Sequence, residues 1–213
     1  MAFPRFHHRA AAVTGSNVAA CAQGCVVVSG GRQASATGLI LRSTELYSVQ
    51  SDTWTAGPDM PWAAYQHVLV DTRKGSVVVA SGASGLNGAT VTNDSAMWSP
   101  EASAWTRLGP LSAGRWRAAA AVGSDVTGSY VVVTGGQTGR LTSGASALVD
   151  VLTLTDPPRW VTGATLTTRR TEHTIAAFSA DGAAYFVVAG GRDQTSTVLD
   201  SVEYINAGRL QAG

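Results

Sequence analysis

Four short apolar runs recur along the chain, and each ends in a pair of small residues. They occupy positions 26–31, 77–82, 131–136 and 186–191. The second small residue of each pair is a glycine, and these glycines lie 51, 54 and 55 positions apart. Self-similarity at such a period is the sequence sign of a repeat architecture, in which one supersecondary unit is copied along the chain.

Aromatic residues follow the small pairs at a second fixed spacing. Tyr47 precedes Trp54 by seven positions, and Trp98 precedes Trp105 by the same number. The third unit keeps a tryptophan but has Leu152 or Thr153 in place of the first aromatic residue. The predicted structural positions of the repeat are Gly30, Gly31, Tyr47, Trp54, Gly82, Trp98, Trp105, Gly135, Gly136, Trp160, Gly190, Gly191 and Tyr204.

Each unit divides into four strands by the usual alternation of β-branched or aromatic runs with turn residues. In the first unit the strands are expected at about 8–13, 26–29, 43–47 and 53–55. The uninterrupted valines of the second strand predict burial on both faces, because a half-solvated strand would alternate. The chain is expected to form one domain of four units, at approximately 3–57, 58–109, 110–163 and 164–213.

The apolar run, the Gly-Gly pair and the tyrosine and tryptophan separated by six residues resemble the kelch repeat. The resemblance covers nearly the whole chain, with Ser81 in place of one glycine. It implies an all-β, kelch-type β-propeller with about four blades of four antiparallel strands, the last of them incomplete. Kelch propellers usually have six or seven blades. Three readings follow: a segment of a larger ring, an arc whose ends a partner subunit covers, or a compact four-bladed closure.

The composition limits the classes of partner that the chain is expected to bind. The net charge is +1 and only 14% of residues are charged, so no basic excess favours nucleic acid, and no apolar run is long enough for membrane insertion. Cys21 and Cys25 are too few for a zinc site and are expected to be free thiols. Low cysteine use and an N-terminus without a secretory signal favour an intracellular, cytoplasmic location.

Basic residues recur just before the first strands, although the second unit keeps only His67 and has Ala64 in place of the arginine. In the first and fourth units an arginine stands three positions before a histidine. In the third unit two arginines flank Trp116. The predicted ligand-binding residues are Arg5, His8, Arg115, Arg117, Arg170 and His173. The resemblance implies that arginines of this loop line a channel mouth that receives an acidic peptide, and planar guanidiniums suit carboxylates. The alternative is that they cap strand ends and pair with nearby acids such as Glu172.

The function expected from these features is a non-catalytic protein–protein interaction module, either an adaptor or a structural subunit of a larger assembly. It would bind another protein through an acidic peptide or through open blade edges. The alternative is a carbohydrate-binding or carbohydrate-active propeller, because the family resemblance extends to mutarotases and copper oxidases. No catalytic residue, metal-ligand spacing or cofactor motif stands out, so no cofactor is expected.

Overall fold

A computed structural model describes residues 1, 4–13, 21, 23–33, 38–139 and 144–206. Within them the chain forms four antiparallel sheets and one short 3-10 helix, η2 (Leu86–Gly88). The first three sheets have four strands each and the fourth has three, in sequence order within every sheet. We call these sheets blades 1 to 4. Each blade lies within one of the four expected units.

The strands follow the β-branched runs of the sequence. Blade 1 contains β1 (Arg9–Val13), β2 (Cys25–Ser29), β3 (Thr44–Ser48) and β4 (Thr53–Gly57). Blade 2 contains β5 (Val68–Asp71), β6 (Val77–Ala80), β7 (Ser95–Trp98) and β8 (Thr106–Arg107). Blade 3 contains β9 (Ala119–Asp125), β10 (Gly128–Thr134), β11 (Val149–Thr153) and β12 (Arg159–Thr162). Blade 4 contains β13 (Thr174–Ala180), β14 (Ala183–Ala189) and β15 (Val202–Asn206).

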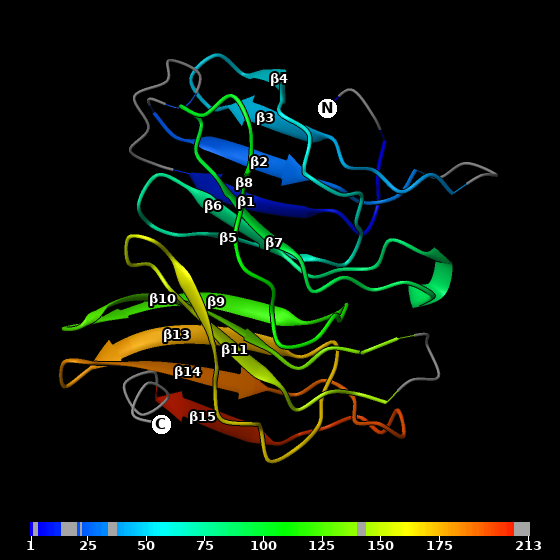
Figure 1. The fold of residues 1–213 in the computed structure, drawn as a ribbon, viewed down its shortest axis with the longest axis vertical. Coiled ribbons are helices and arrows are strands. Elements are labelled where there is room, and N and C mark those ends of the chain that lie inside the picture. The colour runs from blue at the N-terminus through cyan, green and yellow to red at the C-terminus, as the bar shows by residue number, and fades with distance from the viewer. Residues whose placement is uncertain (2–3, 14–20, 22, 34–37, 140–143, 207–213) are drawn as a thin grey trace.

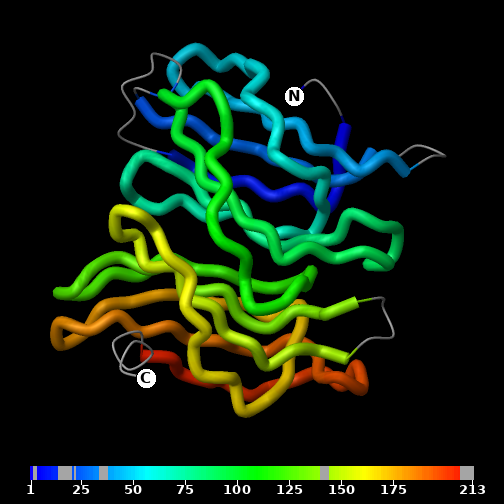
Figure 2. The backbone as a smooth tube through the Cα atoms, viewed as in Figure 1, coloured from blue at the N-terminus to red at the C-terminus, as the bar shows by residue number. Residues whose placement is uncertain are grey.

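The blades stack face to face in chain order, with blade 1 and blade 4 at opposite ends (Figure 1). The backbone trace shows the same order, from blue at one end to red at the other (Figure 2). A separate apolar core lies between each pair of neighbouring blades. The first strands β1, β5, β9 and β13 contact one another in sequence. This arrangement is an open stack of propeller blades and not a four-bladed ring.

Burial of the valine-rich second strands depends on their place in the stack. All four residues of β6 are buried, as expected for a strand with a sheet on each side. In β14 buried and half-buried residues alternate, because blade 3 covers only one face of blade 4. The expected lack of a last strand in unit four falls at 207–213, outside the described residues.

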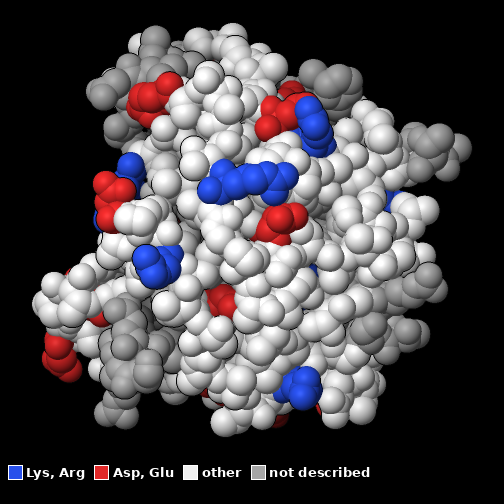
Figure 3. Space-filling view, viewed as in Figure 1, with Lys and Arg blue, Asp and Glu red and all other residues white. Residues whose placement is uncertain are grey.

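Charged side chains are sparse on the face seen in Figure 3, where basic and acidic groups lie side by side. Arg42 with Asp59, and Arg107 with Asp94, form exposed ion pairs. No helix in the described part of the chain is long and apolar enough to span a membrane.

Candidate functional site

One residue just before the first strand of each blade has left-handed backbone geometry. These residues are His7, Gln66, Arg117 and Glu172, with φ between 49° and 56°. Main-chain hydrogen bonds join them from blade to blade: the N–H of Gln66 donates to His7 (2.9 Å), that of Arg117 to Gln66 (3.1 Å) and that of Glu172 to Arg117 (3.2 Å). We call this arc of four residues the mouth, since it crosses all four blades beside their innermost strands.

Two guanidiniums gather around the one carboxylate of the mouth. Arg117 forms an ion pair with Glu172 at 2.7 Å, and its Nε donates to the Gln66 side chain at 3.2 Å. Arg192 approaches the same Glu172 carboxylate at 3.7 Å. Burial and the charges of the nearest arginines, Arg117 first, lower the pKa of His7. Arg117 of the mouth and Arg192 beside it therefore share the single carboxylate of Glu172.

Aromatic rings support the mouth from beneath. Tyr65 and Trp116 are buried and meet edge to face, with centroids 5.7 Å apart. The Arg32 guanidinium lies 5.2 Å from the Tyr65 centroid and 5.5 Å from that of Phe6, while Arg117 lies 4.5 Å over Trp116. Such cation–π contacts hold the guanidiniums in place without neutralising them.

Three of the predicted ligand-binding arginines are enclosed within their own blades. The side chains of Arg5, Arg115 and Arg170 have no exposed surface. They form ion pairs with Glu45 (2.5 Å), Asp150 (2.5 Å) and Glu203 (2.7 Å), respectively. Each guanidinium also donates to a main-chain carbonyl at the end of the second strand: Gly30, Val133 or Gly190. A ligand at the mouth would not reach these groups, so the geometry gives them the structural role.

Blade 2 lacks both partners of this ion pair. Ala64 stands where the other blades have arginine, and Ala96 stands opposite Val79, where the other blades have the acid. The acid had a sequence signal, because Glu45 and Asp150 each follow the second glycine by 14 positions. The joint loss of arginine and acid indicates that the two positions form a unit.

Histidines join neighbouring blades. His67 of blade 2 bonds Ser29 of blade 1 at 2.9 Å, and His173 of blade 4 bonds Thr134 of blade 3 at 2.8 Å. Burial, followed by the charge of Arg9, lowers the pKa of His67 to about 3. Burial and the guanidiniums of Arg170 and Arg115 lower the pKa of His173 to about 4. Both rings are thus held neutral.

Among the six predicted ligand-binding residues, only Arg117 belongs to the mouth. His173 lies partly in a groove of about 240 Å³ between the first strands, lined by Arg9, Val68–Val70, Ala118–Ala120 and His173–Ile175. His8 is half-buried. Ligand binding by Arg117, His8 and His173 stays a prediction. No group of three or more His, Cys, Asp or Glu side chains gathers among the described residues.

The two outer faces of the stack, which we call the end faces, carry exposed apolar side chains. Trp54 on blade 1 is 40% exposed, whereas Trp105 at the same repeat position on blade 2 is 8% exposed. On blade 4, Tyr204 is 72% and Phe178 47% exposed. A hollow of about 450 Å³ lies beside Trp54, and one of about 510 Å³ lies beside Tyr204.

The predicted equivalence of Tyr204 with Tyr47 is wrong. Tyr47 pairs with Val26, five residues before the second glycine, but Tyr204 pairs with Val187, four residues before it. Ile205 is the true counterpart of Tyr47 and lies in the core between blades 3 and 4. Tyr204 therefore points to the opposite face, away from blade 3.

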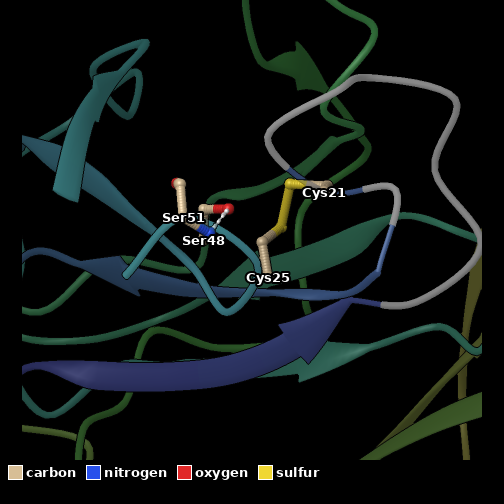
Figure 4. The surroundings of a disulfide bond; sticks show 4 residues. All are labelled: Cys21, Cys25, Ser48 and Ser51. Carbon is tan, nitrogen blue, oxygen red and sulfur yellow. Dashed lines mark hydrogen bonds between the residues drawn. A yellow bond between two sulfur atoms is a disulfide. The ribbon is translucent and has the colours of Figure 1, made fainter. Parts of the chain in front are cut away.

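The cysteines are not free thiols. Cys21 and Cys25 form a disulfide at the start of β2 (Figure 4), and both residues lie in the core between blades 1 and 2. The spacing gave no sign of this bond, since two nearby cysteines are equally compatible with thiols. Disulfides persist in oxidising compartments, so the bond removes the support that free thiols gave to a cytoplasmic location.

Comparison with known proteins agrees with the fold. Residues 5–61, which span the first unit, match the family model described as the Kelch motif. No curated protein matches the chain. A solved structure titled "Structure of YjhT" is similar over 95% of this chain and 84% of that chain, with a TM-score of 0.59 and 10% identity. At this identity the likeness concerns the fold alone.

Proposed function

We propose that this kelch-repeat β-propeller protein is a non-catalytic interaction module that binds further propeller blades through its end faces. The proposal rests on one observation: the bonds that join neighbouring blades recur in register inside the chain, and the same groups lie open at its end faces. A scaffold fold does not define a function, which depends on the surfaces that the fold presents.

The recurring bonds involve the second glycine of each blade. The N–H groups of Gly31, Gly82 and Gly136 donate to Ala64, Arg115 and Arg170 of the next blade, each at 2.8 Å. The next blade donates back, from Ala64 to Leu41 (3.1 Å), from Arg115 to Thr92 (3.4 Å) and from Arg170 to Ser146 (2.9 Å). Every interior junction thus contains the same reciprocal pair of main-chain bonds.

Blade 4 presents the same groups without a neighbour. Gly191 matches the donor glycines, and Leu199, which bonds back to it at 2.9 Å, matches the acceptors. Within the described part of the chain, neither the Gly191 N–H nor the Leu199 carbonyl has a bond of the junction type. On blade 1 the matching groups are the main-chain carbonyl and N–H of Arg5. Both ends of the stack are therefore set for another junction.

Apolar surface accompanies these groups. Phe178, Tyr204 and Val202 are all about half or more exposed on blade 4, and Trp54 is exposed on blade 1. Large apolar side chains exposed on one face favour an interaction site. A kelch-type blade fits the end faces better than an isolated peptide, because it supplies both the main-chain register and a broad apolar face.

A chain extended by one blade tests the proposal. We would place a copy of residues 110–165 directly before Met1, because this keeps the spacing between successive blades. If the end face of blade 1 accepts a blade, Trp54 becomes buried, its fluorescence shifts to the blue and acrylamide quenches it less. The Trp54→Phe variant isolates that signal. A flexible glycine–serine extension of equal length is the control.

The proposal fails if Trp54 remains as accessible in the blade-extended chain as in the control, or if the added unit unfolds separately from the rest. Burial of Trp54 with a single, later unfolding transition would support it.

Binding of an acidic peptide at the mouth is a second candidate. Arg32, Arg117 and Arg192 supply more positive charge there than Glu172 offsets. Calorimetric titration with a glutamate-rich peptide should show binding that weakens in Arg117→Gln and with added salt, but not in Arg42→Gln, which alters an exposed pair elsewhere. Parallel titration with glucose and glucuronate tests the carbohydrate alternative. Equal binding by all variants would exclude the mouth.

A further inference from the structure

Two of the three interior junctions share a buried hydrogen bond between a histidine and a hydroxyl group. The hydroxyl belongs to the residue just before the small pair of one blade, Ser29 or Thr134. The histidine, His67 or His173, opens the first strand region of the next blade. In both junctions the histidine therefore reaches back to the preceding blade.

The remaining junction lacks both partners. Ala80 of blade 2 stands at the hydroxyl position, and Ala118 of blade 3 stands at the histidine position; both are buried. The three junctions contain two complete pairs and one complete absence. None of them places a histidine opposite an alanine.

At the three interior junctions, glycine at the first position of the small pair accompanies the histidine of the next blade. A side chain at Gly30 would meet the Ala64 carbonyl at 2.4 Å and the His67 ring at 2.8 Å. One at Gly135 would meet the Arg170 carbonyl at 2.4 Å and the His173 ring at 2.5 Å. Ser81, with φ of 58°, occupies the same position where the next blade has Ala118 instead of histidine. The ring thus forms a hydrogen bond with one residue of the preceding blade, and together with a main-chain carbonyl it leaves no room for a side chain at the next residue.

The two end faces do not supply a matching pair of histidine and hydroxyl group. His8 of blade 1 holds the repeat position of His67 and His173, whose rings face the preceding blade, and no hydroxyl group is bonded to it among the described residues. Blade 4 has Ala189 at the hydroxyl position. Closure of blade 4 onto blade 1, within one chain or between two copies, would place a histidine opposite an alanine.

We infer that His8 selects the blade that docks before blade 1, and that this blade has serine or threonine directly before its glycine pair. The inference rests on the proposed end-face function and names the chemistry of its partner. A second copy of this chain is a poor partner for blade 1, because its Ala189 offers no hydroxyl. A polar ring enclosed without a hydrogen-bond partner loses the water that satisfied it in the free protein.

The blade-extended chain provides the test, because Thr134 of the added copy would face His8. Four chains form a double-mutant cycle: the copy with Thr134 or with Thr134→Ala, each combined with His8 or His8→Ala. Docking of the copy is followed through Trp54 fluorescence across a urea series. We expect Thr134→Ala in the copy to lower the docking constant about five- to tenfold when His8 is present, and less than about twofold in the His8→Ala background.

The outcomes separate the two claims. An equal effect of Thr134→Ala in both backgrounds, or no effect in either, overturns the selection by His8 while burial of Trp54 still supports docking at the end face. Exposure of Trp54 in all four chains overturns both.

Discussion

Blades 2 and 3 are neighbours with the same strand order, yet they fill the same interior position in opposite ways. Blade 3 encloses the ion pair of Arg115 with Asp150, whose side chains are 0% and 1% exposed. Blade 2 has Ala64 and Ala96 there, both fully buried. The blade fold therefore does not require the ion pair. Its two partners are retained together or lost together.

This difference agrees with the energetics of buried charge. Attraction inside a protein often only offsets the desolvation of both ions, so an apolar pair can serve as well. An unpaired buried charge is much worse than either. The repeat thus accepts either an ion pair or two alanines at these positions, and it does not combine a charged residue with an alanine.

The largest effect is expected from creating that mixed state in blade 3. Asp150→Ala leaves the Arg115 guanidinium buried without a carboxylate, which should lower the free energy of unfolding by about 3–5 kcal/mol. The double variant Arg115→Ala/Asp150→Ala makes blade 3 resemble blade 2 and should lose less than Asp150→Ala alone. Urea denaturation measures both.

Asp59→Ala is the matched control, because Asp59 pairs with Arg42 on the surface, where the side chains are 46% and 60% exposed. Its cost should stay within about 1 kcal/mol. Additive losses in the double variant would contradict the paired behaviour of Arg115 and Asp150.

Acid should weaken the junctions that contain histidine. The pKa values of His67 and His173 are lowered to about 3 and about 4 in the folded chain, against 6.5 for the free side chain. Protonation therefore favours the unfolded chain, so the stability they contribute is present above pH 6.5 and is lost as the pH falls toward 4. Between pH 7 and pH 5 each histidine should cost about 2 kcal/mol.

Urea denaturation midpoints measured between pH 7 and pH 5 test this loss of stability. His173→Ala should show a shallower pH dependence than the wild type, because one of the two buried titrating groups is gone. A pH dependence that is unchanged in His173→Ala would show that other groups govern acid stability.

The disulfide extends the comparison to blade 1, because blades 2 to 4 contain no cysteine. Closing so short a loop restricts the unfolded chain only modestly, so Cys21→Ala/Cys25→Ala should lower the free energy of unfolding by about 2 kcal/mol. Alkylation of the unfolded, unreduced protein should label neither cysteine, as mass spectrometry would show. Two labelled thiols would restore the prediction of free cysteines.

The repeat itself could be predicted from sequence because it is local. The strand expected at about 26–29 is β2 (Cys25–Ser29), and that expected at about 53–55 is β4 (Thr53–Gly57). The chain also signalled the buried second strands, whose valines require a cover on both faces. Regular spacing and side-chain polarity were enough for these features.

What the sequence could not provide depends on register and on contacts between distant residues. Glu203 follows Gly191 by 12 positions, whereas Glu45 follows Gly31 by 14, so a count along the chain does not lead to Ile205, and its aromatic neighbour Tyr204 was taken for the counterpart of Tyr47. Arg5, Arg115 and Arg170 recur as a surface site would, but their burial depends on acids 33 to 40 residues away. Conversely, the left-handed residues of the mouth share no side-chain type that could have revealed them.

The smallest effect concerns the hydrogen bonds that distinguish two junctions from the third. Ser29→Ala should lower the free energy of unfolding by about 1 kcal/mol, because His67 loses its partner in a fully buried position. Ala80→Ser adds the same hydroxyl at the junction where Ala118 replaces the histidine, and it should give no gain. If Ala80→Ser stabilises the chain as much as Ser29→Ala destabilises it, the hydroxyl acts without the histidine. In that case the joint absence of histidine and hydroxyl group between blades 2 and 3 would be a chance substitution. It would then say nothing about which blade can dock at an end face.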